Sequence, residues 1–252
     1  MRILIIGGSG VLGTELIQQL TPLKDEIRWD APSHDELDIC DPDSLDTWLQ
    51  DKWYDTIVLS VGEKDQQAIE SDSHAALQSN IIGVANVVSA MQRNKCQARL
   101  AYISTGYVYK GDKSYHKEND GVFPCNKYAW SKLSGECAVR MLDENRHLII
   151  RCEFSKAPWH KNYAFIDQYT SREELEITAH KICRLVLKRA TGTYNIGGRK
   201  KSVYQYAKSL SEGKEVLKCK IEDFATVPLP HDSSLNTGKY NRFMEGKDGK
   251  TT

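Results

Sequence analysis

The chain has 252 residues, with 34 Lys and Arg against 34 Asp and Glu, so its formal net charge is zero. This length suits one large α/β domain, or one domain with a small appendage. The balanced charge gives no net field that would favour nucleic acid or an anionic membrane as a partner. A mean hydropathy of −0.52 and the lack of a long apolar run argue against a membrane span.

The cysteines and histidines give no sign of a metal site. The seven cysteines are scattered without a Cys-x-x-Cys pair, and the seven histidines show no ligand spacing. The apolar N-terminal run is interrupted by glycines after Ile6, so it predicts a buried strand rather than a secretory signal. We therefore expect a reduced, cytoplasmic setting.

Short apolar runs alternate with stretches of helical periodicity through the first two thirds of the chain. The predicted strands are residues 2–6, 26–30, 56–61, 99–105 and 147–152. The predicted helices are residues 10–20, 42–51, 75–94 and 126–144, with Asp41 as the N-cap of the second. Because these strands are too apolar to alternate, they predict an α/β fold with a doubly wound, parallel Rossmann sheet covered on both faces.

The pattern loosens beyond residue 151. Residues 154–163 are polar and aromatic and predict a loop over a site, whereas residues 228–236 break regular structure with two prolines. Further helices are expected at 173–189 and 203–212, with a strand at 193–196. The polar tail from about residue 245 is expected to be disordered.

A glycine-rich segment follows the first predicted strand and opens a helix, with the spacing G-x-x-G-x-x-G. Gly7 allows the tight turn, Gly10 allows close approach to a pyrophosphate, and Gly13 lets the helix and strand pack closely. The unpaired N–H groups at Val11 and Leu12 would then meet the phosphates. This motif predicts a dinucleotide site, and a glycine turn without a ligand is the alternative.

The segment after the second predicted strand bears on the choice of cofactor. Asp30 ends that strand, where an acid commonly holds the ribose hydroxyls and repels a 2′-phosphate. This position favours NADH, but Lys24 or Arg28 could reach a phosphate, so NADPH stays open. Asp38 and Ile39 are expected near the adenine, although a helix cap competes for Asp38. Further cofactor contacts are predicted where the third strand ends, at Ser60, Val61 and Gly62.

The residues with acid–base chemistry lie near the middle of the chain. An apolar strand runs into Ser104 and Thr105, at the carboxyl end where open α/β sheets bind their ligands. Tyr128 and Lys132 are four residues apart in the next predicted helix and share one face. The nearby ammonium favours the phenolate and is expected to lower the pKa of Tyr128. A Tyr-x-x-x-Lys match alone is common on exposed helices; here it follows a dinucleotide loop.

These motifs resemble the extended short-chain dehydrogenase/reductase superfamily and, within it, the dTDP-4-dehydrorhamnose reductase family. The narrower resemblance is carried by separate blocks that together span nearly the whole chain. The family's S-T-D-Y-V-F is similar to residues 104–109, its Y-G-x-S-K-L-x-G-E to 128–136, its D-Q to 167–168, its G-x-Y-x-x strand to 192–196, and its S-x-L-x-T-x-K to 234–239.

The resemblance implies hydride transfer from NADPH or NADH to the 4-keto carbon of a nucleotide-linked deoxyhexose. Tyr128 would protonate the carbonyl oxygen, Thr105 would hydrogen-bond it, and Lys132 would bias Tyr128 and hold the nicotinamide ribose. Asn80 and Ser104 would contact the cofactor, although an isolated Asn is more often helix surface. The candidate substrate contacts are Gly106, Tyr107 and Phe154.

The resemblance also implies the domain organisation and the partners. Residues 1–152 would bind the dinucleotide, and residues 153–252 would form a small substrate cap interleaved with the last sheet elements. The expected partner is a nucleotide sugar, with neither nucleic acid nor a membrane involved. By analogy of fold, a homodimer is a further prediction.

The chain departs from the family pattern mainly on the substrate side. Gly106 replaces the family's acid, and Glu153 stands where the family's R-T-S-W-V-Y has its serine. The segment from 154 to 167 is shorter than the family's substrate loop, and the chain stops soon after Lys239, without the family's last helix. Nearby cations could offset the charge of Glu153: Lys156, His160 and Lys161.

Two other functions are compatible with these motifs. A regulatory subunit that binds NADP without turnover, similar to that of methionine adenosyltransferase, is favoured by the shortened substrate segment. The joint presence of Thr105, Tyr128 and Lys132 opposes that reading. A nucleotide-sugar epimerase would use the same Tyr128 but regenerate its NAD at every turnover. The leading hypothesis is a nucleotide-sugar 4-ketoreductase.

Overall fold

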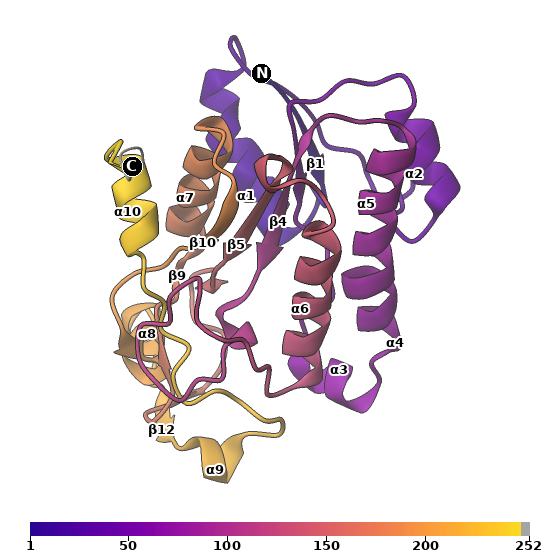
Figure 1. Ribbon diagram of the computed structural model, residues 1–252. Helices are drawn as coiled ribbons and strands as arrows, with labels where there is room; N and C mark the ends of the chain where they lie inside the picture. Colours follow the sequence, from indigo (N-terminus) through magenta and orange to yellow (C-terminus); the bar gives the residue numbers. More distant parts are fainter. Residues whose placement is uncertain (248–252) are drawn as a thin grey trace.

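The computed structural model describes residues 1–247 and is built on a six-stranded parallel sheet (Figure 1). The strand order is β10-β5-β4-β3-β1-β2, which confirms the predicted doubly wound α/β class. The strands are β1 (Arg2–Ile6), β2 (Arg28–Asp30), β3 (Thr56–Leu59), β4 (Arg99–Ser104), β5 (His147–Arg151) and β10 (Gly192–Asn195).

Helices cover both faces of this sheet, and each face has its own apolar core (Figure 1). Along β1, Ile3 and Ile5 belong to one core and Leu4 and Ile6 to the other, because successive side chains point to opposite faces. Helices α1 (Val11–Leu20) and α7 (Leu175–Leu187) cover the first face; α2 (Pro42–Leu49), α5 (Val84–Arg93) and α6 (Lys127–Val139) cover the second. No helix within residues 1–247 is long and apolar enough to cross a membrane.

The helix predicted at residues 75–94 is not regular throughout. It consists of α4 (His74–Ala76), a π-helical segment η2 (Leu77–Gly83) and α5, and a further short helix, α3 (Gln66–Ser71), precedes it. The wider π turn contains Asn80, whose side chain is fully buried and hydrogen-bonded. Such turns occur often at functional sites, and the apolar periodicity does not reveal them.

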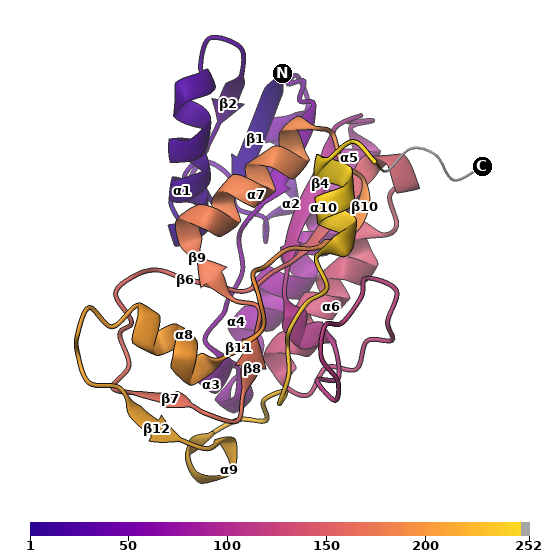
Figure 2. The ribbon, with the colours of Figure 1, turned by 90° about the vertical axis from the view of Figure 1, so that its left-hand side faces the viewer.

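The chain beyond residue 152 adds three two-stranded sheets at one end of the molecule, the end to which the central strands point (Figure 2). The pairs are β6 (Phe154–Ser155) with β9 (Glu173–Glu174), β7 (Tyr163–Phe165) with β12 (Leu217–Cys219), and β8 (Tyr169–Thr170) with β11 (Lys201–Ser202); α8 (Val203–Ser209) and α9 (Ile221–Phe224) accompany them. Strands of two or three residues show no periodicity, so the sequence predicted a loop for the first of them.

The C-terminal segment corrects one prediction. The sequence predicted no helix beyond residue 212 and broken structure at 228–236, but α10 (Gly238–Met244) follows and packs beside β10. Its Tyr240 is buried, and the ring of Phe243 lies 5.4 Å from that of Tyr194, between centroids. A short amphipathic helix is therefore enough to close this edge of the sheet. Most of the predicted disordered tail, residues 248–252, lies outside the described residues.

Candidate active site

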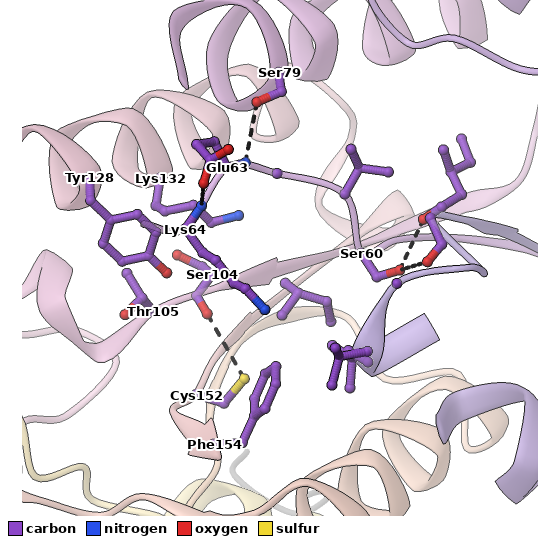
Figure 3. A pocket seen from close by; sticks show the side chains of 18 of the residues that line it. Ser60, Glu63, Lys64, Ser79, Ser104, Thr105, Tyr128, Lys132, Cys152 and Phe154 are labelled. Atoms are coloured by element: carbon purple, nitrogen blue, oxygen red, sulfur yellow. Dashed lines mark hydrogen bonds between the residues drawn. The ribbon is translucent and has the colours of Figure 1, made fainter. Parts of the chain in front are cut away.

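A cavity of about 760 Å³ lies at the carboxyl edge of the central sheet, where open α/β sheets bind their ligands (Figure 3). It extends from the glycine-rich loop to the first residues of the C-terminal part. The predicted site residues that line it are Gly7, Gly10, Val11, Leu12, Asp38, Ile39, Ser60, Val61, Gly62, Ser104, Thr105, Tyr107, Tyr128, Lys132 and Phe154. The predicted residues that do not line it are Gly13, Asp30, Asn80 and Gly106.

The glycine-rich loop forms a cradle that side chains would fill. Gly7 has a φ of 89°, and a Cβ at this position would lie 2.8 Å from Cγ2 of Val61. Gly13 lies behind the cavity, where a Cβ would collide with the Gly7 carbonyl. The N-cap of α1 is Gly10, which has no side chain to cap the helix, and the first turn of α1 contains no acidic residue. The uncapped helix start therefore fits a pyrophosphate group.

Asp30 forms hydrogen bonds that the sequence did not predict. Its Oδ2 accepts hydrogen bonds from Nη2 of Arg2 at 2.8 Å and from the Tyr54 hydroxyl at 2.7 Å. These bonds tie the end of β2 to the start of β1, so the carboxylate is engaged away from the cavity. Pro32 and His34, just beyond it, line the cavity instead. Asp30 therefore does not line the cavity, and its contact with a ribose stays a prediction.

Asn80 is a positioning residue rather than helix surface. Its Nδ2 donates to the Glu63 carbonyl at 2.9 Å and to Oγ of Ser131 at 2.9 Å. These bonds join the loop after β3 to α6, the helix that carries Tyr128 and Lys132. The surface alternative for Asn80 is wrong, because the residue is fully buried, and it does not line the cavity itself.

Thr105, Tyr128 and Lys132 line one wall of the cavity (Figure 3). Burial raises the pKa of Tyr128, and a hydrogen bond with Thr105 opposes that rise. Burial lowers the pKa of Lys132 to about 8, with its Nζ 4.4 Å from the ring centroid of Tyr102. The lowered pKa that the sequence predicted for Tyr128 is therefore wrong for the protein alone, because desolvation of the phenolate outweighs the hydrogen bond with Thr105.

A hydrogen-bonded ion pair holds the floor beneath these residues. Ser104 donates to Oε1 of Glu136 at 2.5 Å, and Nη2 of Arg151 lies 2.6 Å from Oε2 of the same carboxylate. Arg151 also donates to the Tyr109 hydroxyl at 2.8 Å. Burial would lower the pKa of Arg151, but its bonds to Glu136 outweigh burial and raise it. The ends of β4 and β5 are thereby fixed to α6.

A second carboxylate, that of Glu153, lines the same cavity just beyond the end of β5. Oε2 of Glu153 accepts a hydrogen bond from Thr170 at 2.9 Å and lies 3.5 Å from Nη2 of Arg172. Burial raises the pKa of Glu153, and the charge of Arg172 opposes that rise. Gly106 was predicted as a substrate contact, but it lies under Glu153, outside the cavity lining.

Several cavity residues were not among the predicted site residues. The lysines and the arginine among them are Lys64, Lys156 and Arg172, and two histidines, His34 and His160, also line the cavity. Figure 3 shows the side chain of Lys64 extending toward the middle of the cavity. Lys156 and His160 could have been predicted from the sequence, because both had been noted as able to offset the charge of Glu153. Nothing in the sequence indicated Arg172, because its position depends on the chain reversal between β8 and β9.

The sheet topology, the glycine cradle and the Tyr–Lys wall define a Rossmann-type dinucleotide-binding protein. Residues 1–184 match the family described as the RmlD substrate binding domain. The chain belongs to this family, which confirms the resemblance inferred from its motifs.

Relatives with known names agree with this assignment. The chain is 30% identical over 217 residues to dTDP-4-dehydrorhamnose reductase of Burkholderia thailandensis, covering 78% of this chain and 71% of that protein. It is 29% identical over 147 residues to methionine adenosyltransferase 2 subunit beta of Rattus norvegicus, covering 55% and 42%. The structure of dTDP-4-dehydrorhamnose reductase from Bacillus anthracis in complex with NADP shares its fold, with a TM-score of 0.82, 24% identity and coverage of 97% and 91%.

Proposed function

We propose that the protein reduces the 4-keto group of a nucleotide-linked 6-deoxyhexose with NADPH or NADH, as a dTDP-4-dehydrorhamnose reductase-like enzyme of nucleotide-sugar biosynthesis. One observation carries the proposal. Thr105, Tyr128 and Lys132 come from two distant segments and line one wall of a cavity that continues to the glycine cradle. A protein that only binds a dinucleotide has no need for this combination.

The chemistry follows from the wall residues. A bound nicotinamide cofactor supplies the hydride, and the carbonyl oxygen of the sugar then gains negative charge. Tyr128 donates its proton to that oxygen while Thr105 donates a hydrogen bond to it. Because burial raises the pKa of Tyr128, the phenol is protonated at neutral pH and is ready to act as the acid.

Lys132 supports this step in two ways. Its ammonium stabilises the phenolate that remains after Tyr128 has given up its proton, since opposite charges attract strongly in a buried site. The same group would donate hydrogen bonds to the ribose hydroxyls of a bound cofactor. Its pKa of about 8 leaves most of the molecules protonated at neutral pH.

The two halves of the cavity are assigned to the two ligands. We assign the cofactor to residues 1–152 and the sugar nucleotide to residues 153–252, which also contribute β10 and α7 to the central fold. Positive charge on the substrate side supports a diphosphate there, and its sources are Lys156 and Arg172. That the protein is cytoplasmic and that it forms a homodimer both remain predictions. Analytical ultracentrifugation tests whether it is a dimer.

A non-catalytic NADP-binding subunit is the second candidate. The relationship to methionine adenosyltransferase 2 subunit beta favours it, as do the changes at Gly106 and Glu153 on the substrate wall. The third candidate, an epimerase, needs the same Tyr128 but consumes no reduced cofactor overall. These functions differ in what happens to the cofactor.

The test mixes the protein with NADH or NADPH and a dTDP- or UDP-4-keto-6-deoxyhexose, and follows the absorbance of the reduced cofactor. We expect stoichiometric oxidation, slowed by about 10²–10⁴-fold in Tyr128→Phe. Tyr115→Phe, half exposed and away from this cavity, is the matched control. Tight cofactor binding without oxidation would identify the regulatory subunit, and product without net cofactor consumption would identify the epimerase.

A further inference from the structure

Two changes on the substrate wall are in direct contact. Gly106 follows the end of β4, and Glu153 follows the end of the neighbouring strand, β5. A Cβ at Gly106 would lie 2.6 Å from Oε1 of Glu153, closer than a real Cβ approaches another atom. The carboxylate of residue 153 therefore occupies the space that a side chain at residue 106 would need.

The resembling family pattern has the opposite arrangement at these two positions, with an acid at 106 and a serine at 153. This chain carries glycine at the first position and glutamate at the second. One carboxylate is present in both cases, and it enters the same region from neighbouring strands. In this chain a side chain at residue 106 would have to displace the carboxylate of Glu153.

Glu153 is built as a hydrogen-bond acceptor that is only half used. Its side chain is 6% exposed, and Oε2 is engaged by Thr170 and Arg172. Oε1 makes no hydrogen bond of good geometry among residues 1–247, although the Ser233 side chain lies near enough to act on the pKa of Glu153, and Nε of Arg172 has no partner there either. A buried carboxylate oxygen without a donor is costly, so this oxygen is suited to a donor that a ligand brings.

The position of Glu153 limits what that donor can be. Its negative charge contributes to the raised pKa of Tyr107 and of Tyr128, which places it close to the proposed acid. An ionised carboxylate accepts hydrogen bonds and does not donate them. It cannot stabilise the oxygen that gains charge during reduction, but it can bind a hydroxyl group of the same sugar ring.

We propose that Glu153 has taken over from position 106 as the acid that recognises the sugar. Its Oε1 accepts a hydrogen bond from a ring hydroxyl of the 4-keto-deoxyhexose. Arg172 and Thr170 hold the carboxylate in place, and Gly106 provides the room. Glu153 is thus a specificity-determining residue, and this assignment rests on the proposed reductase function.

The test is a cycle of four proteins: wild type, Gly106→Asp, Glu153→Ser, and the double variant that carries both changes. Glu153→Ser is expected to lower kcat/KM for the keto-sugar by about 10- to 100-fold, mainly through KM, as for the loss of a hydrogen bond to a charged group. Gly106→Asp alone is expected to lose more, because its side chain collides with Glu153. The double variant should exceed both single variants, since the acid returns from position 106.

Two measurements keep folding defects apart from lost recognition. Each variant must bind NADPH with wild-type Kd and retain its Tm. Glu153→Gln, which keeps the shape of the side chain, serves as a second variant if Glu153→Ser is unstable, and the same rise in KM is expected. A double variant no more active than Glu153→Ser, or a stable Glu153 variant with wild-type KM, overturns the proposal.

Binding separates this proposal from the reductase function. By titration calorimetry with NADP present, Glu153→Ser should weaken binding of the dTDP-linked sugar and leave dTDP binding unchanged. If the wild-type protein binds the dTDP-linked sugar but does not reduce it, the proposed reductase function is wrong. The comparison of binding by wild type and Glu153→Ser then still tests the sugar contact of Glu153. If Glu153→Ser weakens the binding of dTDP and of the dTDP-linked sugar equally, Glu153 does not contact the sugar. If the wild-type protein neither reduces nor binds the sugar nucleotide, both proposals are wrong.

Discussion

Two buried carboxylate–guanidinium pairs flank the cavity, and they differ in how completely they are satisfied. Glu136 and Arg151 meet through two hydrogen bonds, at 2.6 and 2.9 Å, and Ser104 donates to the same carboxylate. Glu153 and Arg172 meet at a single distance of 3.5 Å, and each keeps a buried polar atom without a partner among the described residues. The first pair is complete in the protein alone, whereas the second has capacity left for a ligand.

This difference separates the two sides of the active site. A buried ion pair is not in itself evidence of stability, because desolvation cancels much of the attraction. The hydrogen bonds around it decide its role. The floor under the cofactor side is fixed by Glu136, which holds β4, β5 and α6 together. The substrate wall around Glu153 is held less completely, as expected where a variable ligand binds.

The largest expected effect is on the complete pair. Glu136→Ala leaves Arg151 buried without its partner, and breaking such a pair lowers the free energy of unfolding by about 3–5 kcal/mol. Urea denaturation measures this loss. Glu153→Ala is the matched comparison and should lose clearly less, because the side chain of Arg172 is 19% exposed and reaches solvent. Equal losses in the two variants would contradict the distinction between the pairs.

The next effect concerns Lys132, whose replacement is expected to stabilise the folded protein rather than destabilise it. The pKa of this buried amine is about 8 in the folded protein against 10.5 as the ordinary value, a cost of roughly 3 kcal/mol while the amine is charged. Lys132→Met should therefore raise the Tm at pH 7 although it removes activity.

The pH dependence of this gain follows from proton binding. Between about pH 8 and pH 10.5 the unfolded chain holds the proton of Lys132 and the folded protein does not, so wild-type stability rises with pH relative to the variant. The advantage of Lys132→Met should be complete below pH 8 and fade across this window, as measured by thermal melts of the protein without cofactor. An advantage independent of pH would show that lost charge is not its cause.

A smaller effect is expected at the glycine cradle. A methyl group on Gly13 meets the Gly7 carbonyl and lies 2.7 Å from the Gly8 Cα, so the loop must shift. Overpacking of this kind costs about 1–3 kcal/mol, or roughly 5- to 150-fold in the Kd for NADPH. Gly121→Ala is the control, because its Cβ would meet no atom within 4 Å. Unchanged cofactor binding in Gly13→Ala would argue against the cradle.

The smallest effect is predicted for Asp30. Because its carboxylate binds Arg2 and Tyr54 away from the cavity, Asp30→Asn should change the ratio of the Kd values for NADPH and NADH by about twofold at most, as for a change outside the site. Fluorescence titration with both cofactors measures this ratio. A shift of tenfold or more toward NADPH would restore the role that the sequence predicted for Asp30.

The cofactor side was largely predictable from the sequence, because its signals are local. The glycine spacing, the i, i+4 pair of Tyr128 and Lys132, and the hydroxyls that end β4 all depend on a few neighbouring residues and on regular elements. The predictions were less accurate where a residue distant in the sequence determines what a side chain contacts. Asp30 is hydrogen-bonded to Arg2, and burial reversed the expected pKa shift of Tyr128.

The substrate side depends on contacts between distant segments, so less of it could be predicted. Gly106 and Glu153 were recognised as unusual one at a time, but their mutual contact required the register of β4 and β5. Arg172 reaches the cavity only because three short sheets fold the later chain back over it. Strands of two residues leave no pattern in the sequence from which that arrangement could be inferred.

The most direct test of the account is the transfer of an isotopic label. NADPH or NADH carrying deuterium at both hydrogen positions of carbon 4 of the nicotinamide is incubated with the protein and a dTDP-4-keto-6-deoxyhexose, and the product is analysed by mass spectrometry and NMR. The account predicts one deuterium at carbon 4 of the reduced sugar, formed much more slowly by Tyr128→Phe. A product without the label, or no product from any 4-keto-sugar nucleotide despite bound cofactor, would contradict it.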